Sequence, residues 1–158
     1  MKAQLHTSMG DITIQLLDTT TPKTVENFIK LAQNGFYNET KFHRVIEKFM
    51  IQGGDPLTKD DSQAALWGTG GPGYKFDDEI TPSNNNSIGT IAMANSGPNT
   101  NGSQFFINVA DNNFLDTKHT VFGRVMEGMN VVNAIVETPV NGSDKPLTSV
   151  VLNSVTVS

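Results

Sequence analysis

The sequence contains no cysteine and no long run of apolar residues. The absence of cysteine excludes disulfide bridges and thiolate metal sites, and it leaves the redox compartment open. The amino terminus alternates polar and apolar residues, so we see no signal peptide, and no stretch is apolar enough to span a membrane. From these absences we expect a cytoplasmic protein that has no membrane partner.

The familiar catalytic motifs are absent as well. The chain has no Gly-x-Ser-x-Gly elbow, no phosphate loop that ends in Gly-Lys-Ser/Thr, and no His-Glu-x-x-His. The glycine-rich residues 68–73 are followed by neither Lys-Ser/Thr nor an evident helix, which favours a turn-rich loop over a phosphate cradle. The three histidines, His6, His43 and His119, are too widely spaced to predict a metal site. We therefore expect no metal and no other cofactor.

Positive charge is scarce: 11 Lys and Arg stand against 16 Asp and Glu, which leaves a formal net charge of −5. This balance argues against a nucleic-acid partner, because phosphate backbones are bound by clustered basic residues. The acidic residues at 60–61 and 77–79 lack the alternating spacing of a calcium loop, so we interpret them as solvated loop faces.

The length of 158 residues fits one domain, expected over residues 1–158. The 14 glycines and the many asparagines favour turns and β structure over a helical bundle. Because no exposed apolar stripe stands out in the pattern, we expect a monomer.

Alternating or apolar runs predict a series of β-strands. They lie at residues 2–7, 11–17, 41–46, 49–52, 88–94, 104–109, 120–125 and 150–157. Thr21 and Pro22 predict the cap and first residue of a helix that ends near Gly35, and residues 129–135 predict a second, shorter helix. Residues 53–86 are rich in turn formers and read as a long ordered loop region, in which Trp67 packs the loop. The pattern is that of an antiparallel sheet or barrel, and it does not choose between barrel and sandwich.

Two segments, residues 42–55 and 93–107, have an unusual composition that combines one arginine with glutamines, aromatics and methionine. Neither segment holds a good nucleophile or general base. In strands, alternate residues share a face. Met50 and Gln52 are therefore expected on one face, as are Gln104 and Phe106, whereas Phe105 is expected in the core.

The same alternation places Arg44 on one face with Phe42 and Ile46. An arginine beside an apolar floor, with amide groups around it, suits a neutral polar substrate that carries an apolar ring. Taken one at a time, these residues are better explained by ordinary roles, since Phe and Met usually belong to the core and a lone Arg is usually a solvated charge.

Both segments resemble the signature stretches of the cyclophilin family of peptidyl-prolyl cis-trans isomerases. Residues 42–55 contain Phe-His-Arg-x-Ile and Phe-Met-x-Gln-Gly-Gly-Asp, and residues 93–107 read Met-Ala-Asn-x-Gly-Pro-Asn-Thr-Asn-Gly-Ser-Gln-Phe-Phe-Ile. Residues 114–123 and the helix start at 22–28 fit as well, so the resemblance covers nearly the whole chain in order. The short loops look more like the compact bacterial members. The resemblance implies a mainly β fold, a closed eight-stranded antiparallel β-barrel capped by two α-helices.

The resemblance also implies a site on the outside of the barrel, with Arg44 as the catalytic residue. The residues implied for the proline pocket are Phe49, Met50, Phe106 and Leu115. The residues implied to hold the substrate backbone are Gln52, Ala94, Asn95 and Gln104. His119 is implied at the pocket edge, and His43 is taken as structural because alternation turns it away from Arg44.

The implied activity is acceleration of rotation about X–Pro peptide bonds by non-covalent catalysis, which would assist protein folding. The implied partners are proline-containing peptides and unfolded or folding proteins. Phe114 stands where many eukaryotic members carry Trp, whose indole is tied in the family to tight binding of cyclosporin, so only weak cyclosporin binding is expected. Two alternatives remain open: a proline-peptide binding module without relevant turnover, and a lipocalin-like barrel with an interior ligand. Large paired aromatics such as Phe105 and Phe122 count against the second.

Overall fold

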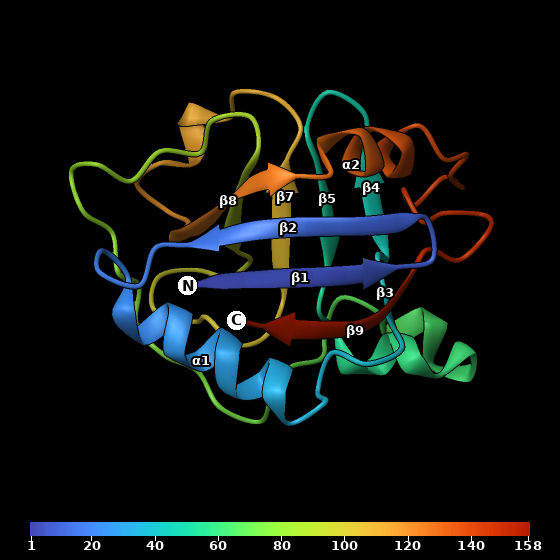
Figure 1. Ribbon diagram of the computed structural model, residues 1–158. Coiled ribbons are helices and arrows are strands. Elements are labelled where there is room, and N and C mark those ends of the chain that lie inside the picture. Colours follow the sequence, from blue (N-terminus) through green and yellow to red (C-terminus); the bar gives the residue numbers. More distant parts are fainter.

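The computed structural model describes residues 1–158 as one antiparallel sheet with helices packed around it (Figure 1). The strands run in the order β3-β9-β1-β2-β8-β6-β7-β5-β4. They are β1 Lys2–Thr7, β2 Gly10–Leu16, β3 Thr40–Lys41, β4 Arg44–Ile46, β5 Met50–Gly53, β6 Thr90–Met93, β7 Phe105–Asn108, β8 Val121–Glu127 and β9 Val151–Val157. The helices are α1 Pro22–Gln33 and α2 Met129–Val136, with 3-10 helices η1 Pro56–Lys59, η2 Asp61–Leu66 and η3 Asn113–Leu115.

The mainly β, antiparallel architecture with two α-helices is confirmed. Side chains in β1 and β2 alternate between buried and more exposed positions, because the polar–apolar alternation of the sequence matches the two-residue period of a strand. In Figure 1, β1, β2 and β9 cross in front of β4, β5 and β7, so the sheet curls back over itself and encloses the core.

The closed eight-stranded barrel is wrong for this chain: the sheet is an open, curled half-barrel of nine strands, with β3 and β4 as its unpaired edges. The single strand expected at 41–46 is split, because the chain leaves the sheet at Phe42 and His43. β3 then pairs with β9, and β4 pairs with β5. The edge at β4 is covered by the segment before β9, since the N–H of Val45 donates to Asp144 O at 2.8 Å. The pairing of β3 with β9 continues one residue further, where the N–H of Phe42 donates to Val150 O at 3.0 Å.

The break between β3 and β4 also changes the position of Phe42 from the expected one. Phe42 does not share the face of Arg44, but is buried in the main hydrophobic core of 23 residues. An aromatic group fills the middle of that core, where the ring of Phe28 lies 5.3 Å from both Tyr37 and Phe122 and 6.0 Å from Phe105, measured between centroids. Since these rings occupy the inside of the curled sheet, the structure counts against a lipocalin-like interior site.

The start of α1 is held by a residue distant in sequence. Thr21 makes no side-chain cap, because its hydroxyl donates instead to Leu17 O. The carboxylate of Glu79 accepts the N–H groups of Lys23 and Thr24 at 3.2 and 2.5 Å, together with the hydroxyl of Thr24 at 2.6 Å. The interpretation of 77–79 as a wholly solvated face was therefore wrong for Glu79, which satisfies the free N–H groups of a helix start.

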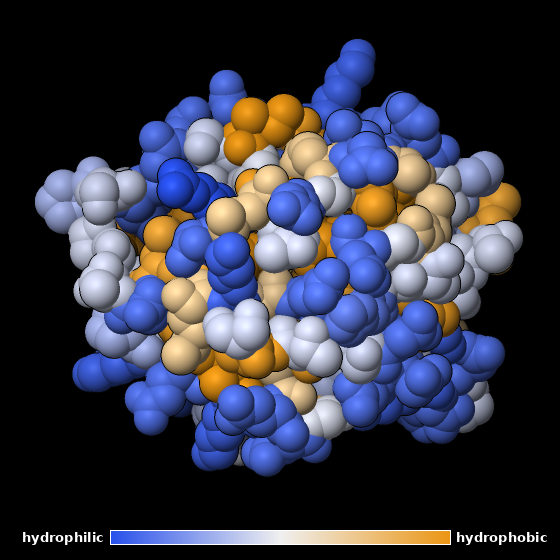
Figure 2. Space-filling view, in the orientation of Figure 1, coloured by the Kyte–Doolittle hydropathy of each residue, from blue (hydrophilic) through white to orange (hydrophobic).

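The face in Figure 2, which is drawn in the orientation of Figure 1, is largely hydrophilic, with apolar residues in separate small areas. The expected monomer stays a prediction. None of the helices has both the length and the apolar character that crossing a bilayer demands.

We expect Glu79→Ala to lower the free energy of unfolding by about 2 kcal/mol, because it removes charge-assisted hydrogen bonds from the first turn of α1. Urea unfolding with an unchanged slope measures the loss. The matched control is Asp77→Ala, which removes an exposed carboxylate that makes no hydrogen bond in the structure and is expected to change stability by less than about 0.5 kcal/mol. Equal losses in the two variants would show that Glu79 does not cap the helix.

Candidate active site

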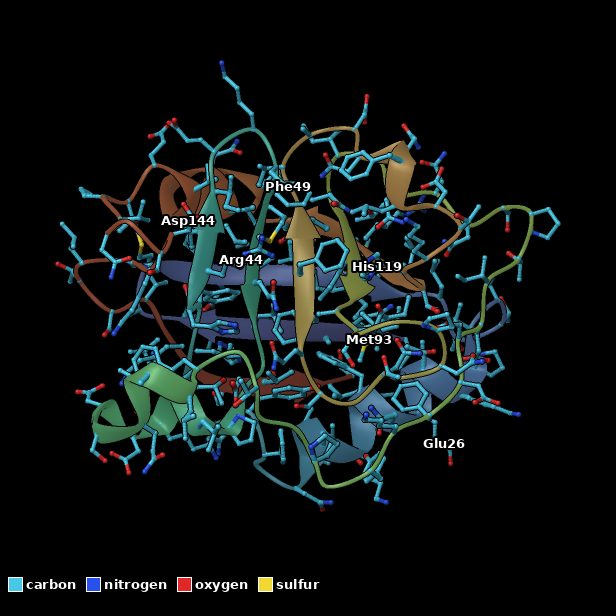
Figure 3. The ribbon with its side chains drawn as sticks, turned by 180° about the vertical axis from the view of Figure 1, so that it is seen from behind. Glu26, Arg44, Phe49, Met93, His119 and Asp144 are labelled. Carbon is cyan, nitrogen blue, oxygen red and sulfur yellow. The ribbon has the colours of Figure 1, made fainter.

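The outer face of β4, β5, β7, β6 and β8 carries a second, smaller apolar cluster. Figure 3 labels Arg44, Phe49 and His119, which lie around it. Its buried members are Met50, Ala92, Phe106 and Val121. They lie outside the main core because each strand sends alternate side chains to opposite faces, so that Ile51 and Phe105 point inward while their neighbours point outward. The outer face therefore has an apolar floor of its own.

A cavity of about 150 Å³ lies on this floor. Its lining is Arg44, Phe49, Met50, Gln52, Ala94, Asn95, Phe106, Leu115 and His119. The structure thus brings together every site residue expected from the sequence except Gln104 and Phe114. Apolar cavities of about this size accept one small ring, as benzene-binding cavities show. We call it the ring cavity.

Gln104 lies beside the ring cavity in a chain of side-chain hydrogen bonds that ends on Arg44. Arg44 Nη1 donates to Gln52 Oε1 at 3.4 Å, and Gln52 Nε2 donates to Gln104 Oε1 at 2.9 Å. Gln104 Nε2 in turn donates to the carbonyl oxygens of Gly68 and Gly70, at 2.9 Å each. Because one guanidinium N–H serves this chain, the remaining N–H groups of Arg44 are free for other acceptors.

His119 has a defined tautomer at the edge of the ring cavity. Its Nδ1 lies 2.8 Å from Met93 O, and a carbonyl oxygen only accepts, so Nδ1 carries the proton. In the neutral imidazole, Nε2 is then an acceptor. The ring meets Phe106 edge-on, at 5.3 Å between centroids and 82° between planes, which fixes its orientation.

Phe114 lies on the rim, outside the lining of the ring cavity. It belongs to the short helix η3, and its side chain is 69% exposed. The ring stacks on Phe49 with 6.1 Å between centroids and 26° between planes. A partner bound at the ring cavity would therefore meet a flat aromatic surface at this side.

A larger hollow of about 590 Å³ adjoins the ring cavity and shares Gln52, Ala94 and Asn95 with it. Gln104 lines this hollow, whose other wall is formed by residues 68–75. The two cavities meet at these shared residues. The ring cavity has a largely apolar lining, whereas the hollow is lined mainly by polar residues and glycines.

Asp55 organises the wall of that hollow, a role that sequence reasoning missed. Its fully buried carboxylate accepts the N–H groups of Leu57 at 2.8 Å, Gly68 at 2.6 Å and Gly70 at 3.1 Å. The carbonyl groups of the same two glycines accept from Gln104. The available signal was the position of Asp55 at the end of the first signature segment, directly before the long loop.

The chain is similar in sequence to a known family over almost its whole length. The sequence model of the family described as cyclophilin type peptidyl-prolyl cis-trans isomerase/CLD matches residues 2–157. Peptidyl-prolyl cis-trans isomerase-like 1 of Homo sapiens is 46% identical over 147 residues, which cover 92% of this chain and 86% of the relative. Peptidyl-prolyl cis-trans isomerase-like 2 of Gibberella zeae is 44% identical over 156 residues, but 98% of this chain spans only 26% of that protein.

A solved structure is similar over the whole chain. It is that of a Cryptosporidium parvum cyclophilin type peptidyl-prolyl cis-trans isomerase, crystallised in the presence of the dipeptide Ala-Pro. The TM-score is 0.91 at 33% sequence identity, and the match covers 100% of this chain and 99% of the other.

His43 precedes Arg44 in the break between β3 and β4, where strand alternation does not apply, and the two residues line a cavity together. Its side chain is 7% exposed, and neither ring nitrogen has a hydrogen-bond partner. Burial lowers the pKa of His43 below its ordinary value of 6.5, although the nearby Asp55 carboxylate opposes the shift. The folded protein therefore keeps this imidazole neutral under conditions in which an unfolded chain would protonate it.

We expect His43 to make the protein less stable as the pH falls below 6.5. The unfolded state binds the proton that the folded state resists, so protonation favours unfolding. Between pH 7 and pH 5 the wild type should lose up to about 2 kcal/mol more of its unfolding free energy than His43→Gln, which cannot titrate at this position. Urea unfolding of both proteins at the two pH values measures the difference, and equal losses would contradict the buried neutral imidazole.

Proposed function

The chain belongs to the cyclophilin-type peptidyl-prolyl cis-trans isomerases, and on this premise we propose that it accelerates X–Pro rotation non-covalently at the ring cavity beside Arg44. The observation that carries the proposal is a guanidinium with free donors at the rim of an apolar cavity large enough for one ring. The lining offers no cysteine, serine or lysine that could form a covalent intermediate.

The energetic demand on such a site is small. Rotation about a peptide bond has a barrier of about 18–20 kcal/mol because the C–N bond has partial double-bond character. Uncatalysed prolyl isomerisation takes roughly 10–100 s. Raising a rate of about 0.01 per second to a typical ~10 per second requires about 4 kcal/mol of transition-state stabilisation. Preferential binding of the twisted bond can supply this without covalent chemistry.

Arg44 is the residue proposed to recognise the twisted bond. When the bond twists, resonance is lost and the prolyl nitrogen regains a lone pair that can accept a hydrogen bond. A guanidinium donor aimed at that nitrogen binds the twisted state better than the planar one, which is the condition for catalysis. Hydrogen bonds to charged groups contribute about 1.5–3 kcal/mol each, a large part of the requirement.

The other site residues are proposed to hold the peptide while the bond turns. Phe49, Met50, Phe106 and Leu115 would enclose the proline ring. Gln52, Asn95 and Gln104 would bind the peptide backbone through their amides, with Ala94 as a flat wall and His119 at the edge. The Ala-Pro dipeptide used with the similar Cryptosporidium parvum protein supports a proline-containing peptide as the ligand of this chain.

The proposed partners are proline-containing peptides and proteins that are unfolded or still folding. Isomerisation about X–Pro bonds is slow enough to limit folding, so an enzyme that accelerates it assists folding. The binding of such segments requires an open site, and the ring cavity lies on the outer surface of the sheet (Figure 3).

We expect Arg44→Ala to lower kcat/KM on an Ala-Pro peptide by about 10- to 150-fold, because one charged hydrogen bond to the transition state is lost. The fold should survive, since Arg44 is exposed. Two-dimensional exchange NMR measures the catalysed rate, with wild type and variant side by side.

The control is Arg124→Ala, which removes the only other arginine, an exposed residue on β8. It should leave the rate unchanged. Normal turnover by a folded Arg44→Ala protein would falsify the role of Arg44. If the wild type does not accelerate exchange but the peptide shifts resonances of the ring cavity, the protein is a proline-peptide binding module instead.

We expect Phe114→Trp to raise the affinity for cyclosporin while turnover of the Ala-Pro peptide stays within about twofold of the wild type. Indole offers a larger apolar face than phenyl and adds an N–H donor. Because Phe114 is exposed on the rim and stacks on Phe49, the larger ring can be accommodated without repacking the core. Titration calorimetry gives the affinity, and Phe114→Ala serves as the control that should weaken it. An unchanged affinity in Phe114→Trp would rule out this explanation.

A further inference from the structure

A third cavity, of about 320 Å³, lies on the other side of Arg44 and Gln52 from the ring cavity. These two residues face each other across β4 and β5 and line both cavities. We propose that this cavity, called here the basic subsite, binds an acidic side chain of the peptide whose proline occupies the ring cavity. The inference rests on the proposed function and adds a substrate preference to it.

The charges around the basic subsite favour an anion. Its lining includes the cations Arg44 and Lys145 and no acidic residue. Lys145 is held over the ring of Trp67, with its Nζ at 4.1 Å from the ring centroid, and it makes no ion pair. Lys41 lies over the same ring at 5.2 Å, but is paired with Asp61 at 2.7 Å. Lys145 is therefore the ammonium that remains free to bind a ligand.

His43 provides a second, independent observation. Its imidazole lines the basic subsite, is 7% exposed and has no hydrogen-bond partner at either ring nitrogen. Buried polar groups are almost always hydrogen-bonded, so an unpartnered one at a cavity indicates a ligand that completes it. A carboxylate is an acceptor that matches the donors present there, namely a guanidinium, an ammonium and an imidazole N–H.

Neighbouring acidic residues are not part of the lining. The carboxylate of Asp55 interacts electrostatically with His43, but it accepts the backbone N–H groups of Leu57, Gly68 and Gly70. Asp144 lies beside β4 (Figure 3), where its carbonyl oxygen accepts the N–H of Val45 at 2.8 Å, and it is not part of the lining. The carboxylate of Asp60 accepts from the backbone and hydroxyl of Ser62, at 2.9 and 2.7 Å. Arg44 and Gln52 separate the ring cavity from the basic subsite. A peptide strand advances about 3.3 Å per residue, so a side chain within about three positions of the proline can reach past these two residues into the basic subsite.

The test uses peptides with one Ala-Pro bond and a single Glu or Gln at each of the three positions before and after it. Exchange NMR gives kcat/KM, and the indole resonance of Trp67 gives the affinity, because Trp67 is the only tryptophan. At one position Glu should be preferred over Gln by about fivefold, as expected of a single partly exposed ion pair. The preference should fall toward unity in 1 M salt, where charges are screened within about 3 Å.

Variants of Lys145 distinguish an effect on the preference for Glu from an effect on catalysis. Lys145→Gln should abolish the preference for Glu and leave turnover of the all-alanine peptide unchanged, whereas Lys145→Arg and the distant Lys2→Gln should keep the preference. The proposal is overturned if no position prefers Glu, or if the preference survives in Lys145→Gln. If no peptide is turned over but Glu still binds more tightly than Gln, the proposed function fails and the basic subsite stands.

Discussion

Successive side chains on β7 lie on opposite faces of the sheet, so Phe105 enters the core while Phe106 lies on the outside. The same alternation on β5 buries Ile51 inside and turns Met50 and Gln52 outward. Because the main core already stabilises the sheet from within, the outer face can keep a small apolar cluster that is only partly covered. The ring cavity is the uncovered part of that cluster.

The position of Arg44 depends on hydrogen bonds that extend far from it along the chain. The buried carboxylate of Asp55 holds the backbone of Gly68 and Gly70, whose carbonyl groups accept from Gln104. Gln104 accepts from Gln52, which accepts from Arg44. A flexible side chain is thereby given an orientation before substrate arrives, which reduces the entropy lost on binding. The loop region at residues 53–86 thus supports the side chains beside the ring cavity.

The departures from expectation have a common physical cause. Residues 41–46 have the composition of one strand, but at Phe42 and His43 the chain crosses between the two edges of the curled sheet. Phe42 then packs inside, although simple alternation places it with Arg44. The first turn of α1 is likewise capped by Glu79 and not by Thr21. Both features depend on contacts between distant segments, which local periodicity does not contain.

Local spacing was enough to predict most of the strands and both helices, and the long ungapped motifs identified the residues around Arg44 through the resemblance to a family. Three features could not be predicted from the sequence: the sheet stays open at β3 and β4, Asp55 organises the loop, and Lys145 and His43 line one cavity beside Arg44. Edge closure and cavity walls are set by contacts between residues far apart in the chain, whereas periodicity reports only on near neighbours.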